Sequence, residues 1–200
     1  MMNGEVPDMS DYKEQAIFKA AQEVFAEKGF ERATMDEIAL KAKVAKGTLF
    51  YRFKSKDELF LSLIRSALEK LIAELRRVIA QSDNTFDKIG KVIEIQTRES
   101  FQNPHFIKMI LSEGWGIHSR QQQLRVCLKD YLNLLQEIIE EGIRKGSLRK
   151  VNSSILATSM FGMIASASFH LLIVKDAFQI DQTIEELKAF CFKGISPVSD

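Results

Sequence analysis

The sequence has little of what marks secreted, fibrous or low-complexity proteins. It contains 2 cysteines, 3 prolines and 10 glycines in 200 residues. So few glycines and prolines are typical of a folded, helix-rich chain rather than a disordered or all-β one. The cysteines, Cys127 and Cys191, lie in apolar helical patterns, which favours reduced core thiols over a disulfide framework. The start, MMNGEVPDMSDYKEQ, has no charged segment before an apolar run, so we expect no signal peptide and a cytoplasmic location.

Net charge and strand patterns are also nearly absent. Lys and Arg number 28 against 27 Asp and Glu, a formal net charge of +1, so the whole-chain charge predicts no polyanionic partner. No Val-, Ile- and Thr-rich alternating stretch indicates a β-strand, whereas apolar residues recur at helical spacing nearly throughout. We therefore predict an all-α fold of about nine helices. Their expected ranges are 11–28, 34–42, 45–53, 55–81, 85–101, 104–113, 119–145, 152–175 and 180–193.

Local capping signals set several of these expected ends. Gly29 follows the first apolar stripe and is expected as its C-terminal cap. Thr34 and Glu37 have the spacing of a capping box, in which the hydroxyl and the carboxylate each accept a backbone N–H of the other residue. Ser55 and Glu58 repeat that spacing, so a second capping box is expected to open the long helix at 55–81.

Positive charge is concentrated in one short stretch. Residues 41–56 carry six basic side chains and no acidic one, a charge of +6 against +1 for the whole chain. The basic residues are Lys41, Lys43, Lys46, Arg52, Lys54 and Lys56. A charged run is most often a solvated face, so the charge alone does not identify a nucleic-acid site, and the residues around it have to decide.

The helix expected at 45–53 lies inside this basic stretch. Leu49 and Phe53, four residues apart, can bury one face of it. Phe50 and Tyr51 lie on the other face, where exposed aromatic rings add nothing to the stability of the fold. The alternative is that one of them packs against the neighbouring long helix. The functional interpretation is the recognition helix of a DNA-binding helix-turn-helix at 34–53.

On this interpretation each exposed side chain has a role at DNA. Phosphates would be held by Tyr51, Lys46, Lys54 and Lys56. Thr48 and Arg52 would reach base edges, and Phe50 would touch a thymine methyl group. Gly47 lets the helix N-terminus approach the DNA backbone, and Thr34 could offer its amide or hydroxyl to a phosphate beside its role as a cap.

The stretch from Ala16 to Phe60 resembles the N-terminal domain of the TetR family of repressors over its 45 residues. The matching features, in order, are Phe25…Gly29-Phe30, Thr34 followed by Ile38-Ala39, and Val44-Ala45-Lys46-Gly47-Thr48-Leu49 leading to Tyr51, Phe53, Lys54 and Lys56. Each piece is weak, but together at fixed spacing they are specific. The resemblance implies a helix-turn-helix DNA-binding domain at 10–54 and a larger helical ligand-binding and dimerisation domain at 55–195.

Three positions depart from the family pattern. Lys43, also a DNA-binding candidate, stands where a Gly usually makes the turn between the two helices. A left-handed non-Gly residue there costs roughly 1 kcal/mol, so the turn is either strained or reshaped. Phe50 stands where Tyr is frequent, which removes a hydroxyl and one bond to a phosphate. Arg52 replaces a common His and adds a permanent bidentate donor suited to guanine.

Residues 155–174, ILATSMFGMIASASFHLLIV, contain no charge. By length they could span a membrane, but their hydroxyl residues and the central His170 favour a helix buried on every side. The small residues Ser159, Gly162 and Ser166 would allow close approach of another helix. The resemblance implies that this helix and the one at 180–193 form a homodimer interface, which also contains Ile184, Leu187 and Cys191. A two-fold dimer fits a palindromic operator with recognition helices roughly 34–36 Å apart.

The resemblance further implies a cavity for a small, largely apolar effector. Candidates for its wall are Phe101, Met109, Glu113, Trp115, Tyr131, Phe161 and Phe169, although ordinary core packing explains each of them as well. The three histidines have no partner at metal-ligand spacing, so we expect no metal and no cofactor. No nucleophile and base are paired, so we expect no enzyme.

Together these features predict a ligand-responsive repressor. The ligand-free dimer would bind operator DNA, and the effector would move the helix at 55–81, which continues directly from the DNA-binding domain. The rival interpretations are an all-helical enzyme and a membrane-tethered or scaffolding dimer. A catalytic set converging on one site would favour the former, and insolubility without detergent would favour a tether.

Overall fold

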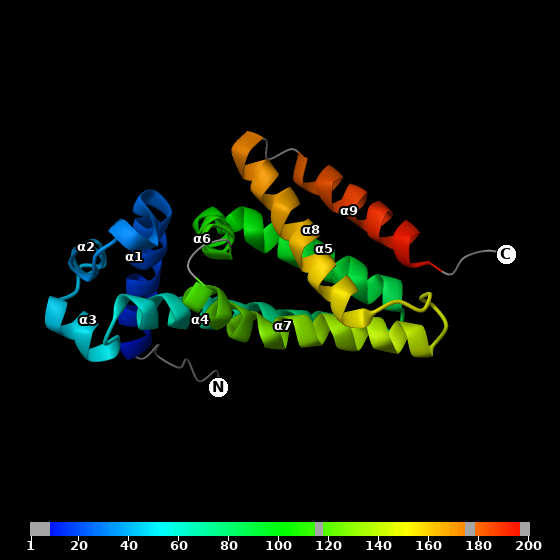
Figure 1. Cartoon of the computed structure of the whole chain (residues 1–200), viewed down its shortest axis with the longest axis horizontal. Helices are drawn as coiled ribbons and strands as arrows, with labels where there is room; N and C mark the ends of the chain where they lie inside the picture. Colours follow the sequence, from blue (N-terminus) through cyan, green and yellow to red (C-terminus); the bar gives the residue numbers. More distant parts are fainter. Residues whose placement is uncertain (1–8, 115–117, 175–178, 197–200) are drawn as a thin grey trace, which may run out of the picture.

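The computed structural model describes residues 9–114, 118–174 and 179–196, and over these ranges the chain forms nine helices and no strand (Figure 1). The predicted all-α fold is confirmed, with helix ends within a few residues of those expected. The helices are α1 (Met9–Arg32), α2 (Met35–Lys41), α3 (Lys46–Arg52), α4 (Lys56–Ile79), α5 (Thr85–Gln102), α6 (Pro104–Gly114), α7 (His118–Arg144), α8 (Ser153–Val174) and α9 (Ile180–Ile195).

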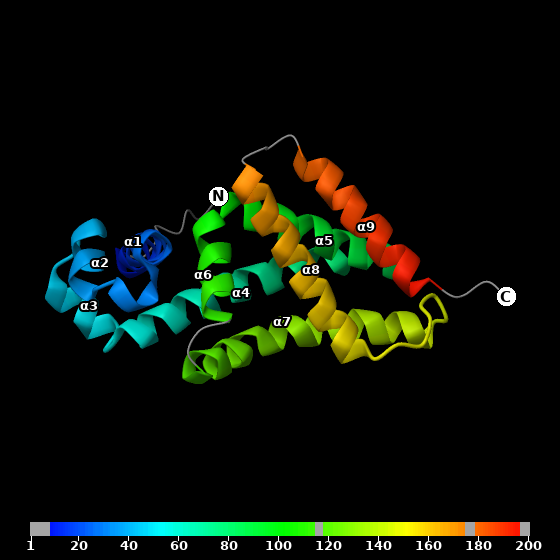
Figure 2. The ribbon, with the colours of Figure 1, turned by 45° about the horizontal axis from the view of Figure 1, so that its top comes forward.

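The helices form a small group at one end of an elongated molecule and a larger group at the other. Helices α1, α2 and α3 make up the small group, and α4 runs from it into the larger group (Figures 1 and 2). There α4 packs along α7 and α5, while α8 and α9 cover α5 on the outer side. Helix α6 packs against α1, so the two groups are joined by α6 as well as by α4.

One continuous hydrophobic core runs through both groups, from Ile17 of α1 to Ile195 of α9. At the junction the rings of Phe25, Phe30 and Phe60 lie 5.2–5.6 Å apart, centroid to centroid. Phe25 and Phe30 come from the first helix, whereas Phe60 belongs to the second turn of α4. The start of α4 is therefore packed into the core of the N-terminal group.

Helix α8 is apolar all round, yet only one of its sides is buried in the protomer. Met160, Ile164 and Leu171 face inward and are at most 2% exposed, whereas Ile155 and Ile173 are 66% and 64% exposed. The expectation of a helix buried on every side is therefore wrong for the single chain. By length and composition alone α8 could cross a membrane, as the sequence also indicated. Its outward face includes the small residues Ser159, Gly162 and Ser166.

Helix α9 turns its apolar stripe toward its own chain. Ile184, Leu187 and Cys191, expected at a dimer interface, lie buried in the protomer and have little surface to offer a partner. Burial raises the pKa of the Cys191 thiol to about 11, as fits an unreactive core cysteine. The large apolar side chain that α9 does expose is Phe190.

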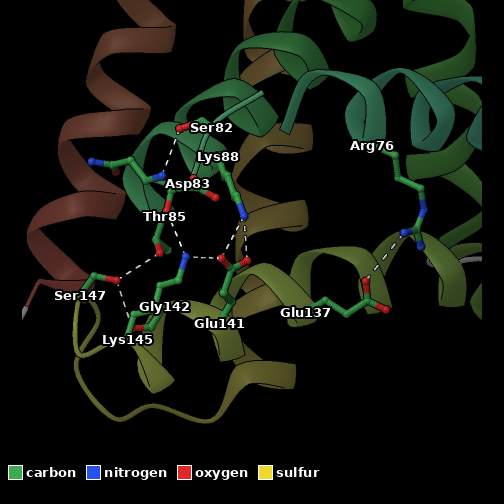
Figure 3. A network of polar contacts seen from close by, with 11 residues as sticks. Arg76, Ser82, Asp83, Thr85, Lys88, Glu137, Glu141, Gly142, Lys145 and Ser147 are labelled. Atoms are coloured by element: carbon green, nitrogen blue, oxygen red, sulfur yellow. Dashed lines mark hydrogen bonds and ion pairs between the residues drawn. The ribbon is translucent and has the colours of Figure 1, made fainter. Parts of the chain in front are cut away.

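A polar network fastens the start of α5 to the end of α7 (Figure 3). Glu141 accepts hydrogen bonds from Lys88 at 2.8 Å and from Lys145 at 2.6 Å. These bonds, first that from Lys145 and then that from Lys88, lower the pKa of Glu141 to about 2. Beside them the Ser147 hydroxyl donates to Thr85 Oγ1 across 3.1 Å. The network fixes this end of the larger group.

Candidate DNA-binding face and effector cavity

The caps around α2 hold the short helices in place. Thr34 and Glu37 form the predicted capping box, with both N–H to oxygen distances at 3.2 Å. At the start of α4 the box is only half formed: Ser55 Oγ accepts the Glu58 N–H, but the Glu58 carboxylate accepts the Lys54 N–H at 2.8 Å. Gly29, with φ 77°, interrupts α1 as its predicted cap, and one further turn follows it.

Lys43 occupies the left-handed region, with φ 55°, in the turn between α2 and α3. Its N–H bonds Leu40 O at 3.1 Å, and the Val44 N–H bonds Ala39 O at 3.0 Å, so the turn is tight and hydrogen-bonded. The turn thus keeps the shape that a glycine would allow, at a cost of about 1 kcal/mol for the lysine. The Lys43 side chain is exposed.

Helix α3 buries one face and exposes the other, as predicted. Leu49 and Phe53 are 0% and 6% exposed, whereas Tyr51 is 90% exposed and Phe50 40%. Tyr51 therefore does not pack against α4. The Lys46 ammonium lies 5.7 Å from the centre of the Phe50 ring. Gly47 and Thr48 lie beside them in the first turn, so α3 presents an aromatic and basic surface at the end of the molecule.

Acidic residues of α1 and α2 pair with much of the basic stretch. Lys46 Nζ lies 2.7 Å from Asp36, and the Arg52 guanidinium lies 2.6 Å from Glu14. Lys41 lies 3.0 Å from both Glu23 and Glu27, and these bonds raise its pKa. Exposed pairs of this kind contribute at most about 1 kcal/mol, so DNA phosphates can replace the carboxylates. Among the basic residues of the stretch, Lys43 and Lys54 have exposed side chains with no bonded partner in the described part of the chain.

Two residues expected at DNA point into the protein instead. The Lys56 ammonium donates to the carbonyls of Phe30, Ala33 and Glu31 at 2.6, 2.8 and 3.0 Å, and it lies 4.5 Å from the centre of the Phe30 ring. All three of its N–H groups are thus used to cap the end of α1. The Arg52 side chain is only 20% exposed, because its guanidinium turns toward Glu14.

A cavity of about 720 Å³ lies where the two groups of helices meet. Its wall is built by α1, α4, α5 and α6, with Phe161 of α8 as the one contribution from the outer layer. Leu63, Leu68 and Ile110 form a buried apolar part of the wall. The exposed part carries Lys19, Lys70 and His105, together with half-buried Glu23, Glu74 and Glu99. The site can therefore take an elongated molecule with an apolar portion.

The predicted cavity residues are only partly brought together. Of the seven, Phe161 lines the cavity and fully buried Tyr131 lies behind it, their rings 5.7 Å apart. Met109 is core, Phe101 is half-buried away from the wall, and Phe169 faces outward, 38% exposed. The Glu113 side chain and Trp115 lie outside the described residues. The prediction missed the contributions of α1, and those of Gln96 and Ser100, two buried polar residues on one face of α5.

Comparison with family models covers nearly the whole chain. Residues 17–63 match the model of bacterial regulatory proteins of the tetR family, and residues 64–194 match that of the C-terminal region of YsiA-like proteins. The fatty acid metabolism regulator protein of Bacillus subtilis (strain 168) is 30% identical over 155 residues, covering 76% of this chain and 79% of the relative. The transcriptional repressor NicS of Pseudomonas putida is 28% identical over 166 residues, covering 80% and 76%.

Solved structures agree. A candidate fatty acid metabolism regulator of Clostridium perfringens has 37% identity and a TM-score of 0.82, covering 92% of this chain and 100% of that one. FadR of Bacillus subtilis, solved in complex with stearoyl-CoA, has a TM-score of 0.83 at 23% identity, which shows the shared fold, covering 90% and 98%. The chain therefore belongs to the TetR family and is a ligand-responsive, DNA-binding transcriptional regulator, not an enzyme.

Proposed function

We propose that this protein is a homodimeric repressor that leaves a palindromic operator when a fatty acyl ligand enters the cavity between its two groups of helices. One observation carries the proposal: the cavity wall contains residues of α1 and of α4, which connects the groups. Helix α1 contacts the end of the recognition helix through the rings of Phe18 and Phe53. A ligand there touches the DNA-binding end directly. The protein would act in the cytoplasm, where its operator lies.

At the operator, α3 enters the major groove. Its exposed Tyr51 and Lys46 hold phosphates together with Lys43, Lys54 and Thr34. The base edges are reached by Thr48 and Phe50, and by Arg52 once it has left Glu14. Gly47 allows close approach of the helix start. Lys56 supports DNA binding without touching DNA, because its bonds to the carbonyls at the end of α1 hold that helix end in place.

The outward face of α8 supports the homodimer. Its apolar and small side chains at helical spacing are Ile155, Ser159, Gly162, Ser166, Phe169 and Ile173. Phe190 of the neighbouring α9 is a further exposed apolar side chain. The small residues in the middle let a second α8 approach closely, and the large ones at the ends supply apolar area to bury.

A long acyl chain suits the effector site. The buried part of the wall is largely aliphatic, and a volume of about 720 Å³ lies within the usual range of ligand pockets. The relatives from Bacillus subtilis and Clostridium perfringens are named for fatty acid metabolism. Lys19 and Lys70 in the outer wall can meet an anionic head group, although three carboxylates lie in the same wall.

Movement of α4 couples the two sites. With 24 residues it is about 36 Å long, so a tilt of a few degrees shifts its end by an ångström or more. Two recognition helices displaced in this way no longer match the spacing of one DNA turn. Because coupling is reciprocal, operator DNA would weaken ligand binding by the same factor.

The proposal is tested with a duplex selected from random DNA by the purified protein. Fluorescence anisotropy would follow binding with and without palmitoyl-CoA, and we expect a loss of affinity of at least about fivefold. Ala67→Trp places a large side chain in the cavity wall, whereas Ala73→Trp alters an exposed position on the same helix. The first variant should lose the response and the second keep it. Unchanged DNA affinity in saturating palmitoyl-CoA would refute the proposed effector class.

A further inference from the structure

Two polar side chains stand in the apolar inner part of the cavity wall. Gln96 and Ser100 lie one turn apart on the same face of α5, and they are 4% and 3% exposed. Both line the cavity. Because buried polar groups are nearly always hydrogen-bonded, the partners of these two side chains identify what the cavity is built to hold.

Tyr131 occupies one side of the Gln96 amide. Its hydroxyl, fully buried, donates to Gln96 Oε1. Burial raises the pKa of Tyr131, so the phenol stays neutral and keeps the proton that it donates. The ring of Phe161, which lines the cavity, packs against the Tyr131 ring in an edge-to-face arrangement. With Oε1 engaged in this way, the amide can turn only its Nε2 donors toward a further partner.

No group of the described residues accepts a hydrogen bond from the remaining donors. Among the described residues neither Gln96 Nε2 nor Ser100 Oγ has a hydrogen-bond partner, and neither atom is sealed from the cavity. The neighbouring Thr97 differs: its hydroxyl is completely enclosed and also unpartnered. Gln96 and Ser100 thus present unused donors to the cavity, while Thr97 presents none.

The buried part of the wall carries no charge. All charged residues of the wall, such as Lys70 and Glu99, are half-buried or exposed. A carboxylate placed against the two donors would lose its hydration without gaining a close cation, which is costly. A neutral carbonyl oxygen loses less and can accept from both donors.

We propose that Gln96 and Ser100 bind the neutral carbonyl group of the effector, with Tyr131 as the positioning residue that orients the Gln96 amide. The ligand class is then an acyl ester or thioester rather than a free fatty acid. This inference rests on the proposed function, because it concerns the same cavity. It adds which atom of the ligand is recognised and by which side chains.

Isothermal titration of the full-length protein compares palmitoyl-CoA with S-hexadecyl-CoA, which lacks the carbonyl oxygen. The wild type should bind palmitoyl-CoA about tenfold more tightly, because only this ligand satisfies the buried donors. Gln96→Leu should reduce that preference to about twofold or less, and Tyr131→Phe should reduce it partially. Thr97→Val, one position away on α5, should retain it in full.

The outcomes separate this inference from the proposed function. Equal binding of both CoA derivatives by the wild type would overturn carbonyl recognition and leave the acyl effector standing. The same holds if Thr97→Val lowers the preference as much as Gln96→Leu, or if palmitate binds more tightly than palmitoyl-CoA. If neither derivative binds, both proposals fail. Thermal melts of each variant identify misfolding, and Ser100→Ala, a smaller change, then replaces Gln96→Leu in the comparison.

Discussion

Replacing Lys56 by methionine separates a structural lysine from a DNA-contacting one. The change keeps an unbranched side chain as far as Cε and removes the ammonium that donates to the carbonyls of Phe30, Glu31 and Ala33. Hydrogen bonds from a charged donor contribute about 1.5–3 kcal/mol net, and the cation–π contact adds about 0.5 kcal/mol. Because Lys56 is half-buried and water can replace part of this, we expect a loss of about 2 kcal/mol.

Thermal unfolding followed by circular dichroism measures this loss. In a chain of 200 residues each kcal/mol corresponds to a shift of about 2–4 °C, so Lys56→Met should melt about 4–8 °C below the wild type. The salt dependence of DNA binding gives the second measurement. If Lys56 holds no phosphate, the slope of log affinity against log salt concentration stays unchanged.

Lys54→Met is the matched control, two positions earlier and exposed. We expect it to leave the melting temperature unchanged and to reduce the salt slope by about 0.9 for each phosphate that the lysine neutralises in the wild type. The reasoning is refuted if Lys56→Met melts like the wild type and reduces the salt slope as Lys54→Met does. Lys56 would then hold DNA rather than the end of α1.

Three further predictions concern the larger group of helices. Gly142→Ala should lower the free energy of unfolding by about 1–3 kcal/mol in denaturant titrations, because its Cβ would lie 2.5 Å from Thr85 Cγ2. The folded-state pKa of Glu141, about 2, lies below its ordinary 4.5, so its contribution is complete above about pH 5 and is lost as the pH falls toward 2. Glu141→Gln should therefore flatten the acid limb of stability against pH, and an unchanged limb would contradict the network. Phe169→Glu should shift gel filtration toward the monomer, whereas Val126→Glu, on exposed α7 surface, should not.

Local pattern was sufficient for the helices and for the face that α3 buries. Thr34 and Glu37 fix the start of α2 through hydrogen bonds between residues three positions apart. Such a short spacing can be recognised in the sequence itself. The alternation of buried Leu49 with exposed Tyr51 follows from helical spacing alone. The family resemblance pointed to the turn at Lys43, because a Gly usually stands there, and left open whether the turn was strained or reshaped; its φ of 55° is left-handed.

Partnerships over long distances could not be predicted in the same way. Arg52 meets Glu14, 38 positions earlier, and Lys56 meets backbone carbonyls, which every residue type provides. The apolar stripe of α9 indicated burial but not whether its own chain or a partner would cover it. The cavity depends on how helices far apart in sequence leave space between them. The wall residues expected from the resemblance therefore included Phe161 but missed the wall from α1.

The aromatic contact of Phe60 with Phe25 and Phe30 has a consequence for exchanging modules between regulators. A DNA-binding unit that ends at position 54 would lack Phe60 and the equally buried Leu59. The apolar side chains that they cover, such as Phe25 and Phe30, would then be exposed to water and would promote aggregation. A transplantable unit has to carry at least the first two turns of α4. A chimera that joins this reader to another sensor is therefore best spliced within a continuous helix, where the residue count across the junction sets the rotation of one half against the other.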